Sequence, residues 1–172
     1  MDKRITCIAT FKEESLLQID NLIKGMNGAF CKIPYGAYDE ERKTVDTLPF
    51  HITLSAWDSE LKNRILRIFN SIIMEQIIVK VNEVKIMNGK ENSFVLYLGI
   101  EKNERLIKLI YEQLPNEKYN PEKFEFHITL DINKDYEKIV EVQNKIAEKL
   151  QPFEMKIDRI KLFEIYPVSE II

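Results

Sequence analysis

One pentapeptide, Phe-His-Ile-Thr-Leu, occurs twice in this chain, at Phe50–Leu54 and again at Phe126–Leu130. The histidines inside the two copies, His51 and His127, are the only histidines in a sequence of 172 residues. Histidine is the side chain whose ordinary pKa lies nearest to neutral pH. A chain that keeps both of its histidines for two copies of one motif is therefore expected to use them together.

A second match lies at the same offset of 76 positions along the chain. The stretch Val79–Ile86 aligns without gaps on Met155–Leu162, and both read apolar, Lys, apolar, two polar residues, apolar, Lys, apolar. Two matches at one offset indicate an internal duplication, with copies at residues 50–87 and 126–163. Because two copies are too few for a solenoid, we expect a single domain, residues 1–172, made of two pseudo-symmetric lobes.

The matched stretches also share an irregularity. In each of them the apolar residues change from alternate positions of one parity to the other parity, at Asn82-Glu83 in the first copy and at Asp158-Arg159 in the second. A β-bulge inserts one extra residue into a strand and produces such a change. The sequence therefore predicts an equivalent bulge, or an equivalent sharp twist, in both copies.

Composition narrows the class of protein. The hydrophobic fraction of 45% suits one compact globular domain. A net charge of −3 with scattered Lys and Arg argues against a protein that coats long duplexes, but not against a pocket for one nucleotide or one RNA end. No apolar run approaches the roughly 20 residues of a membrane span, and the first residues lack the apolar stretch of a signal peptide. The two cysteines form neither a disulfide framework nor a metal-ligand pattern, so we expect a cytoplasmic protein.

Hydrophobic periodicity predicts a mixture of strands and helices. The expected strands are Arg4–Phe11, Phe50–Ser55, Gln76–Met87, Ser93–Ile100, Phe124–Asp131 and Pro152–Tyr166. The expected helices are Glu13–Met26, a helix capped by Asp58, Asn103–Leu114 and Asp135–Leu150. Residues 33–48 carry no clear period and are expected to form a long loop, and such loops are often functional.

Each motif copy presents two polar side chains on one face of its strand. Alternate residues of a strand share a face, so His51 and Thr53 point one way while their apolar neighbours point into a core. The second copy does the same with His127 and Thr129. If the two lobes pack as partners, the two faces converge across a cleft.

Two facing imidazoles suit the chemistry of a phosphodiester. Attack on phosphorus needs a base to take a proton from the nucleophile and an acid to protonate the leaving oxygen, and histidine performs either task near neutral pH. Threonine hydroxyls donate hydrogen bonds to the non-bridging oxygens, where negative charge grows in the transition state. This scheme requires no metal and no other cofactor.

The paired segments His51-Ile52-Thr53-Leu54 and His127-Ile128-Thr129-Leu130 resemble the two His-x-Thr-x signatures of the 2H phosphoesterase superfamily. That superfamily includes bacterial RNA 2′,3′-cyclic phosphodiesterases, also known as 2′-5′ RNA ligases. The resemblance implies an α+β, bilobal duplicated fold, with two antiparallel sheets facing each other across a central cleft and helices on the outside. It also implies that His51 and His127 are catalytic and that Thr53 and Thr129 bind phosphate.

The implied activity is a metal-independent phosphoesterase that opens a 2′,3′-cyclic phosphate or cleaves a 2′,5′ linkage. The expected substrate is an RNA end or a small nucleotide, and we expect a monomer. By analogy with the family, His51 is the acid and His127 the base. Tyr35 and Tyr38, in the long loop, are candidates for stacking on a base; packing of the loop itself is the alternative.

The chain departs from the family beyond the second motif. Many of the RNA cyclic phosphodiesterases carry an Arg in a Thr-Leu-x-Arg pattern, and here that position holds Ile132, preceded by Asp131. Strand alternation places Asp131 on the same face as His127, where it would orient the imidazole. Four strand lysines are candidates for phosphate contacts or for solvated strand faces: Lys80, Lys85, Lys156 and Lys161.

Two other classes of function compete with the enzyme. The first is a non-catalytic module on the same fold that binds an RNA end or a nucleotide without turnover. The second is a metal site formed by the two histidines and Asp131. Zinc sites normally use three or four protein ligands, and the sequence offers no further His and no paired Cys.

Overall fold

The computed structural model describes residues 4–26, 50–90, 92–114, 116, 120–165 and 169–170. Within them the strands are β1 (Arg4–Phe11), β2 (His51–Asp58), β3 (Ile78–Asn88), β4 (Phe94–Ile100), β5 (His127–Asn133), β6 (Phe153–Ile165) and β7 (Ser169–Glu170). The helices are α1 (Glu13–Ile23), α2 (Lys62–Phe69), α3 (Glu104–Gln113) and α4 (Tyr136–Lys149), and a 3₁₀ turn, η1 (Ser59–Leu61), precedes α2. None of these helices is long and apolar enough to cross a membrane.

Polar caps begin two of the helices. The side chain of Asn103 accepts a hydrogen bond from the Leu106 backbone N–H at the start of α3, and Asp135 accepts one from Lys138 at the start of α4. Such caps satisfy backbone donors that have no partner inside the helix. The expected cap by Asp58 is wrong, because β2 continues through Asp58 and its side chain makes no capping bond to η1.

All strand pairs are antiparallel and belong to one hydrogen-bonded sheet in the order β1-β2-β5-β4-β3-β6-β7. Strand β1 also pairs with β6, so the first six strands close into a ring. The expected α+β class is confirmed. The finer expectation of two separate sheets is not, since backbone hydrogen bonds connect all seven strands.

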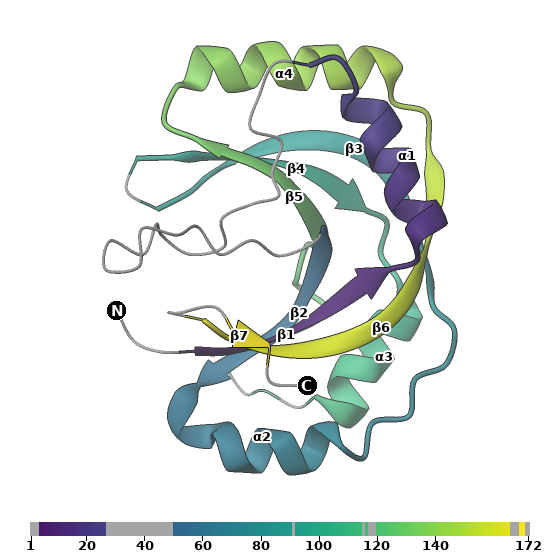
Figure 1. Ribbon diagram of the computed structural model, residues 1–172, viewed down its shortest axis with the longest axis vertical. Coiled ribbons are helices and arrows are strands. Elements are labelled where there is room, and N and C mark those ends of the chain that lie inside the picture. The colour runs from purple at the N-terminus through teal and green to yellow at the C-terminus, as the bar shows by residue number, and fades with distance from the viewer. Residues whose placement is uncertain are drawn as a thin grey trace.

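The ring nevertheless has two halves joined by short contacts. Strands β2 and β5 pair through Ile52 and Ile128 alone, whereas the β3–β6 ladder runs from Ile78–Lys156 to Val81–Phe153. In Figure 1 the sheet is strongly curved, with α4 over β3, β4 and β5 and with α2 and α3 on the far side of β1, β2 and β6. The helices therefore lie on the outer, convex side of the curve.

The core fills the space between the sheet and these helices. Every helix contributes buried apolar residues to one continuous cluster, among them Ile19 of α1, Ile65 of α2, Leu106 of α3 and Ile139 of α4. Burial of apolar surface against a sheet face is the main stabilising contribution to such a layer. The free thiol of Cys7 belongs to this cluster, and burial raises its pKa.

The duplication is visible in the order of elements. At the offset of 76 residues, β2 corresponds to β5, α2 to α4 and β3 to β6. The predicted bulges are confirmed: Asn82 is the extra residue of β3 against β4, and its equivalent Asp158 is the extra residue of β6 against β1. A second equivalent pair of bulges, at Leu54 of β2 and Leu130 of β5, was not predicted from the sequence.

Candidate active site

The two motif strands are neighbours in the sheet. Ile52 of β2 is the Cα partner of Ile128 of β5 in an antiparallel pair. These isoleucines are the central residues of the two His-Ile-Thr segments, so the duplicated motifs meet at their centres. The pairing brings together residues that are 76 positions apart in the chain.

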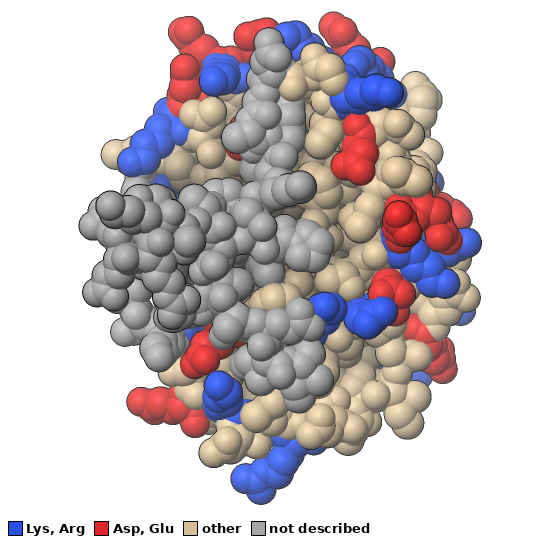
Figure 2. All heavy atoms as spheres, viewed as in Figure 1, with Lys and Arg blue, Asp and Glu red and all other residues tan. Residues whose placement is uncertain are grey.

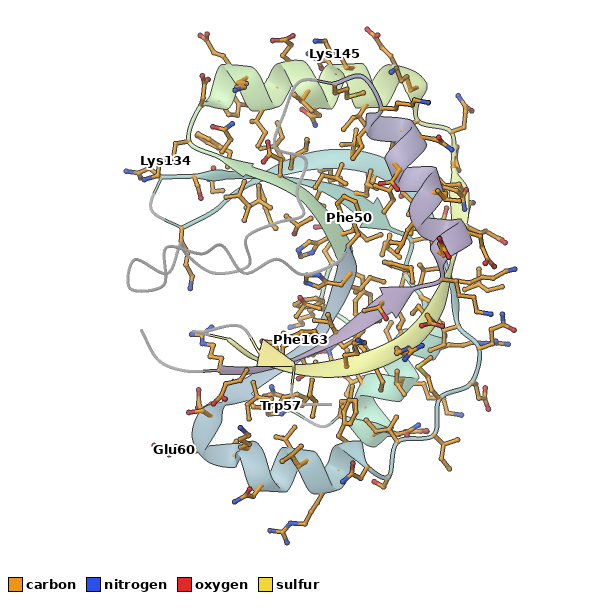
Figure 3. The ribbon with its side chains drawn as sticks, viewed as in Figure 1. Phe50, Trp57, Glu60, Lys134, Lys145 and Phe163 are labelled. Atoms are coloured by element: carbon orange, nitrogen blue, oxygen red, sulfur yellow. The ribbon has the colours of Figure 1, made fainter. Side chains whose placement is uncertain are left out.

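The apolar residues of the two motif strands face the core, as expected from the sequence. Ile52, Leu54, Phe126, Ile128 and Leu130 are all buried in the core cluster. The motif histidines and threonines project from the opposite side of the sheet, which we call the motif face. Figure 3 shows the two sides through Trp57, which points toward α2, and Phe163 of β6, which lies on the motif face.

The register arranges the four polar side chains crosswise. One step along the strands from the Ile52–Ile128 pair, His51 lies across from Thr129 and Thr53 across from His127. In a regular ladder directly opposed side chains are about 5 Å apart at Cβ and diagonal ones about 7–8 Å apart; β2 and β5 share one pair, Ile52–Ile128. The single Ile52–Ile128 pair therefore brings the two motif copies, and with them both histidines, to one part of the motif face.

His51 lies in a largely buried position. It is 7% exposed, and its β1 partner is Thr10, whose hydroxyl donates to the backbone carbonyl of Arg159 at 3.1 Å. Its repeat equivalent, His127, is half-buried. The two histidines thus occupy equivalent strand positions in unequal surroundings.

A backbone contact fixes the protonation pattern of the His127 ring. Its Nδ1 lies 2.9 Å from the backbone carbonyl oxygen of Glu125. Because a carbonyl oxygen only accepts, Nδ1 carries a proton and donates it, and Nε2 is the nitrogen left for chemistry. The ring is further bounded by Tyr97 in an edge contact, with centroids 5.1 Å apart, and by Phe124, stacked with centroids 6.4 Å apart.

Charged groups surround His127 on the motif face. Lys85 Nζ lies 2.8 Å from Glu83 Oε1 and 3.0 Å from Glu125 Oε1, and the Tyr97 hydroxyl donates to the same Glu125 oxygen at 3.4 Å. Hydrogen bonding to Glu83, and secondly to Glu125, raises the pKa of Lys85, while the bond from Lys85 lowers the pKa of Glu125. Burial, more than the nearby charges, raises the pKa of Tyr97.

The expected position of Asp131 is wrong. The bulge at Leu130 shifts the alternation, so Asp131 pairs with Leu96 of the core cluster, whereas Thr129 pairs with Tyr97 of the motif face. Asp131 is 8% exposed on the helix side, and its Oδ1 accepts from the Ile132 N–H at 2.8 Å. A metal site shared by Asp131 and the histidines is therefore excluded. Over the described part of the chain, no group of three or more His, Cys, Asp or Glu side chains is placed to hold a metal.

The remaining candidates have mixed outcomes. Tyr35 and Tyr38 lie outside the described residues. Three of the strand lysines contact carboxylates: Lys80 with Glu101, Lys156 with Glu14, and Lys85 as above. In the register Lys85 lies two strands from Thr129, with Tyr97 between them. Its repeat equivalent Lys161 likewise lies two strands from Thr53, with Ile8 between them. The sequence did not single out Glu83, Tyr97, Gly99, Phe124 or Glu125.

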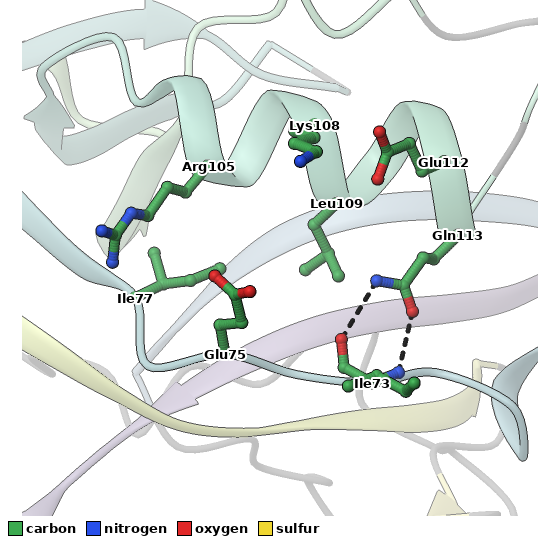
Figure 4. Close-up of a pocket in the computed structure, with 8 residues that line it drawn as sticks. All are labelled: Ile73, Glu75, Ile77, Arg105, Lys108, Leu109, Glu112 and Gln113. Atoms are coloured by element: carbon green, nitrogen blue, oxygen red, sulfur yellow. Dashed lines mark hydrogen bonds between the residues drawn. The ribbon is translucent and has the colours of Figure 1, made fainter.

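A cavity of about 150 Å³ lies away from the motif face, between α3 and the segment that precedes β3. Figure 4 shows the Gln113 side chain holding the Ile73 backbone by two hydrogen bonds beside it. Its lining mixes charged groups of both signs, and none of the motif residues contributes to it. Figure 2 shows positive and negative side chains interspersed over the described surface on the side of the molecule seen in Figure 1.

Comparisons with known proteins agree with the fold and the motifs. The sequence matches the family described as LigT like Phosphoesterase over residues 99–168, which include the second motif. Escherichia coli LigT, solved with 3′-AMP, is 14% identical, with 95% of this chain and 88% of that chain covered and a TM-score of 0.54. Kluyveromyces marxianus Usb1, solved with uridine monophosphate, is 12% identical, with 99% and 98% covered and a TM-score of 0.53. No curated protein matches the sequence.

The fold, the doubled motif and the family match define a LigT-like phosphoesterase fold. The family match covers residues 99–168, which contain the second of the two motifs that resemble those of the 2H phosphoesterase superfamily.

Proposed function

We propose that this protein is a metal-independent phosphoesterase that hydrolyses a cyclic phosphodiester at an RNA end or on a nucleotide, through His51 and His127. The observation that carries the proposal is the Ile52–Ile128 pair, which sets each motif histidine across from the threonine of the other copy. Two proton-transfer groups and two hydroxyl donors then surround one site. We take residues 1–172 as one 2H domain whose lobes contain the copies at 50–87 and 126–163.

In the proposed reaction, water attacks the phosphorus of a 2′,3′-cyclic phosphate. Neutral His127 accepts the proton of the attacking water at Nε2 as the new P–O bond forms. Protonated His51 donates its proton to the ribose oxygen as the old P–O bond breaks, and a phosphomonoester results. The tautomer held by the Glu125 carbonyl supports the role of His127 as base, because it leaves the Nε2 lone pair free. The role of His51 as acid rests on the family resemblance.

The threonines act on the phosphate itself. Thr53 and Thr129 donate hydrogen bonds to the non-bridging oxygens, where charge develops in the transition state. In this proposal one hydroxyl lies on each side of the phosphate, which the antiparallel pairing of the two motif strands supports. The LigT and Usb1 structures contain 3′-AMP and uridine monophosphate, which supports a nucleotide as the group bound at this face.

The test is product analysis on a panel of 2′,3′-cyclic mononucleotides, RNA ending in a cyclic phosphate, and 2′,5′-oligoadenylate. We expect turnover of at least one class, unchanged by a chelator and lost in His51→Ala and His127→Ala. Tight nucleotide binding with no turnover on any substrate would instead identify a binding module. Activity that depends on added metal would overturn the mechanism.

A further inference from the structure

The side chain of Glu125 has no part in the proposed reaction, yet its backbone carbonyl holds His127. Glu125 lies in the segment that leads into β5, which has no regular secondary structure between Phe124 and Phe126. On its far side the segment is anchored, because Phe126 is buried and its carbonyl accepts a hydrogen bond from Ile100 at 3.1 Å. The direction of the Glu125 carbonyl therefore depends on what holds Glu125 itself.

Two groups on neighbouring strands hold that side chain. Lys85 of β3 and Tyr97 of β4 both bond to Glu125 Oε1, at 3.0 Å and 3.4 Å. Lys85 is held in turn by Glu83 Oε1 at 2.8 Å. A chain of contacts thus runs from β3 through Lys85 and Glu125 to Nδ1 of His127.

Gly99 leaves space for this series of contacts. It lies between Glu83 and His127, as the β4 partner of both. A Cβ at Gly99 would lie 2.6 Å from Cγ and 2.8 Å from Oε1 of Glu83, which is too close for any contact between these atoms. The absence of a side chain therefore lets Glu83 lie across β4 toward Lys85.

The group is specific to one lobe. At the offset of 76, Lys85 corresponds to Lys161, whereas Glu83 corresponds to Arg159 and Glu125 to Pro49. The duplication kept the lysine and not its two carboxylates. The two histidines are therefore supported differently, despite their shared motif.

Stability does not account for this arrangement. The side chains of Lys85 and Glu125 are 44% and 56% exposed, and ion pairs between such groups contribute about 0–1 kcal/mol. Orientation of a catalytic base by a third group, in contrast, has a large effect on rate. We propose that Glu125, clamped by Lys85 and Tyr97, is a positioning residue that fixes the ring and tautomer of His127; this rests on the proposed function.

The competing role for Lys85 is direct binding of substrate phosphate, and kinetics separate the two. If Lys85 positions His127, Lys85→Met and Glu125→Gln each lower kcat about 10-fold with little change in KM, since small misplacements of catalytic groups are costly. The double variant is then no worse than either single one. If Lys85 binds phosphate, Lys85→Met raises KM, and Glu125→Gln improves binding by releasing the ammonium group. That second pattern would overturn the proposal.

Controls use matched changes. Lys85→Arg retains a cation that bridges two carboxylates, so kcat should stay within about two-fold of wild type. Lys80→Met removes a lysine of the same strand that contacts Glu101 at 2.9 Å, and it should leave kcat unchanged. Gly99→Ala should reproduce the loss seen in Lys85→Met, because it displaces Glu83.

A readout that needs no substrate distinguishes this inference from the proposed function. With two histidines in the chain, ring ¹⁵N spectra are assignable by comparison with His51→Gln. We expect wild-type His127 to hold its proton on Nδ1, and Lys85→Met to give a mixture of tautomers. If the wild-type protein is inactive but Lys85→Met changes the tautomer of His127, this inference stands and the proposed activity is wrong. If the wild-type protein is active but Lys85→Met leaves both the spectra and the kinetics unchanged, the proposed activity stands and this inference is wrong.

Discussion

Ile52 and Ile128 are equivalent residues of the two motif copies, and they are also partners across the sheet. A pseudo-twofold axis therefore passes between them. The axis exchanges His51 with His127 and Thr53 with Thr129, so in the proposed site each histidine is paired with the threonine of the other copy. Under the proposed function, neither copy alone would contain a complete site.

Removal of either histidine should nearly abolish activity. We expect His51→Ala and His127→Ala each to lower kcat by about 10²- to 10⁴-fold, the usual contribution of a positioned acid or base. The double variant should be little worse than a single one, because the two groups act in one step. The measurement is steady-state kinetics on a cyclic mononucleotide, with circular dichroism as the check on folding.

The pH dependence adds an independent check. Wild type should show a bell-shaped profile of kcat/KM, because one histidine must be neutral and the other protonated. A variant that retains full activity, or a wild-type profile flat between pH 5 and 9, would contradict two-histidine catalysis.

Loss of a motif hydroxyl should slow the reaction while the strand stays intact. Thr53→Val and Thr129→Val preserve the shape of the side chain and remove the donor, and we expect kcat to fall about 10²-fold for each, as for other donors to a developing oxyanion. Thr→Ser at either position keeps the hydroxyl and should retain most of the activity. Thr6→Val is the matched control, because Thr6 lies on the same face beside Ala56 and Phe163. Equal losses in all three valine variants would indicate a packing effect instead.

Much of the fold could be predicted because it follows from local pattern. Strand β1 matches its expected bounds, and helices and hairpin were placed within a few residues, since apolar periodicity reflects burial. The bulges at Asn82 and Asp158 were predictable because their extra residue reverses the alternation of apolar side chains. The bulges at Leu54 and Leu130 could not be predicted, because the extra residue in each is a leucine at a position where the alternating pattern already expects an apolar residue on the core side.

The site was predictable only where the duplication marked it. His51, Thr53, His127 and Thr129 stand out because they repeat. The side chains around His127 are not repeated in the other copy. They come from β3, β4 and the segment before β5, and only strand pairing brings them together. Gly99 within an apolar strand was the one local sign of a close approach.

Asp131 should be dispensable for catalysis. Its carboxylate lies on the helix side of the sheet, and Asp131→Asn retains the oxygen that accepts from Ile132. We expect kcat and the pH profile to stay within about two-fold of wild type, far from the loss expected for a catalytic group. A change in the profile would place Asp131 beside His127 after all, against the register described above.

The contacts of Lys85 and Tyr97 with the Glu125 side chain should make the free energy of unfolding depend on pH in the acid range. Lys85 lowers the folded-state pKa of Glu125, so the stabilisation is present above the unfolded value of about 4.3 and is lost as pH falls through the folded value. The free energy of unfolding of Lys85→Met should therefore lie below that of wild type at pH 7, and the difference should shrink at pH 3. Urea titrations at the two pH values measure it. A difference that is independent of pH would mean that Lys85 acts through packing of its alkyl chain.

The bulge leucines should be important for stability. Leu54 and Leu130 are the extra residues of the two motif strands, yet both are buried in the core, where they anchor the strands directly after the threonines. Leu54→Ala and Leu130→Ala should each lower the free energy of unfolding by about 2–5 kcal/mol, the range for cavities left by buried leucines. Leu17→Ala, at a position that is 54% exposed, should change it by about 0.5 kcal/mol or less. Comparable effects at all three positions, measured by urea denaturation, would contradict the burial of the bulges.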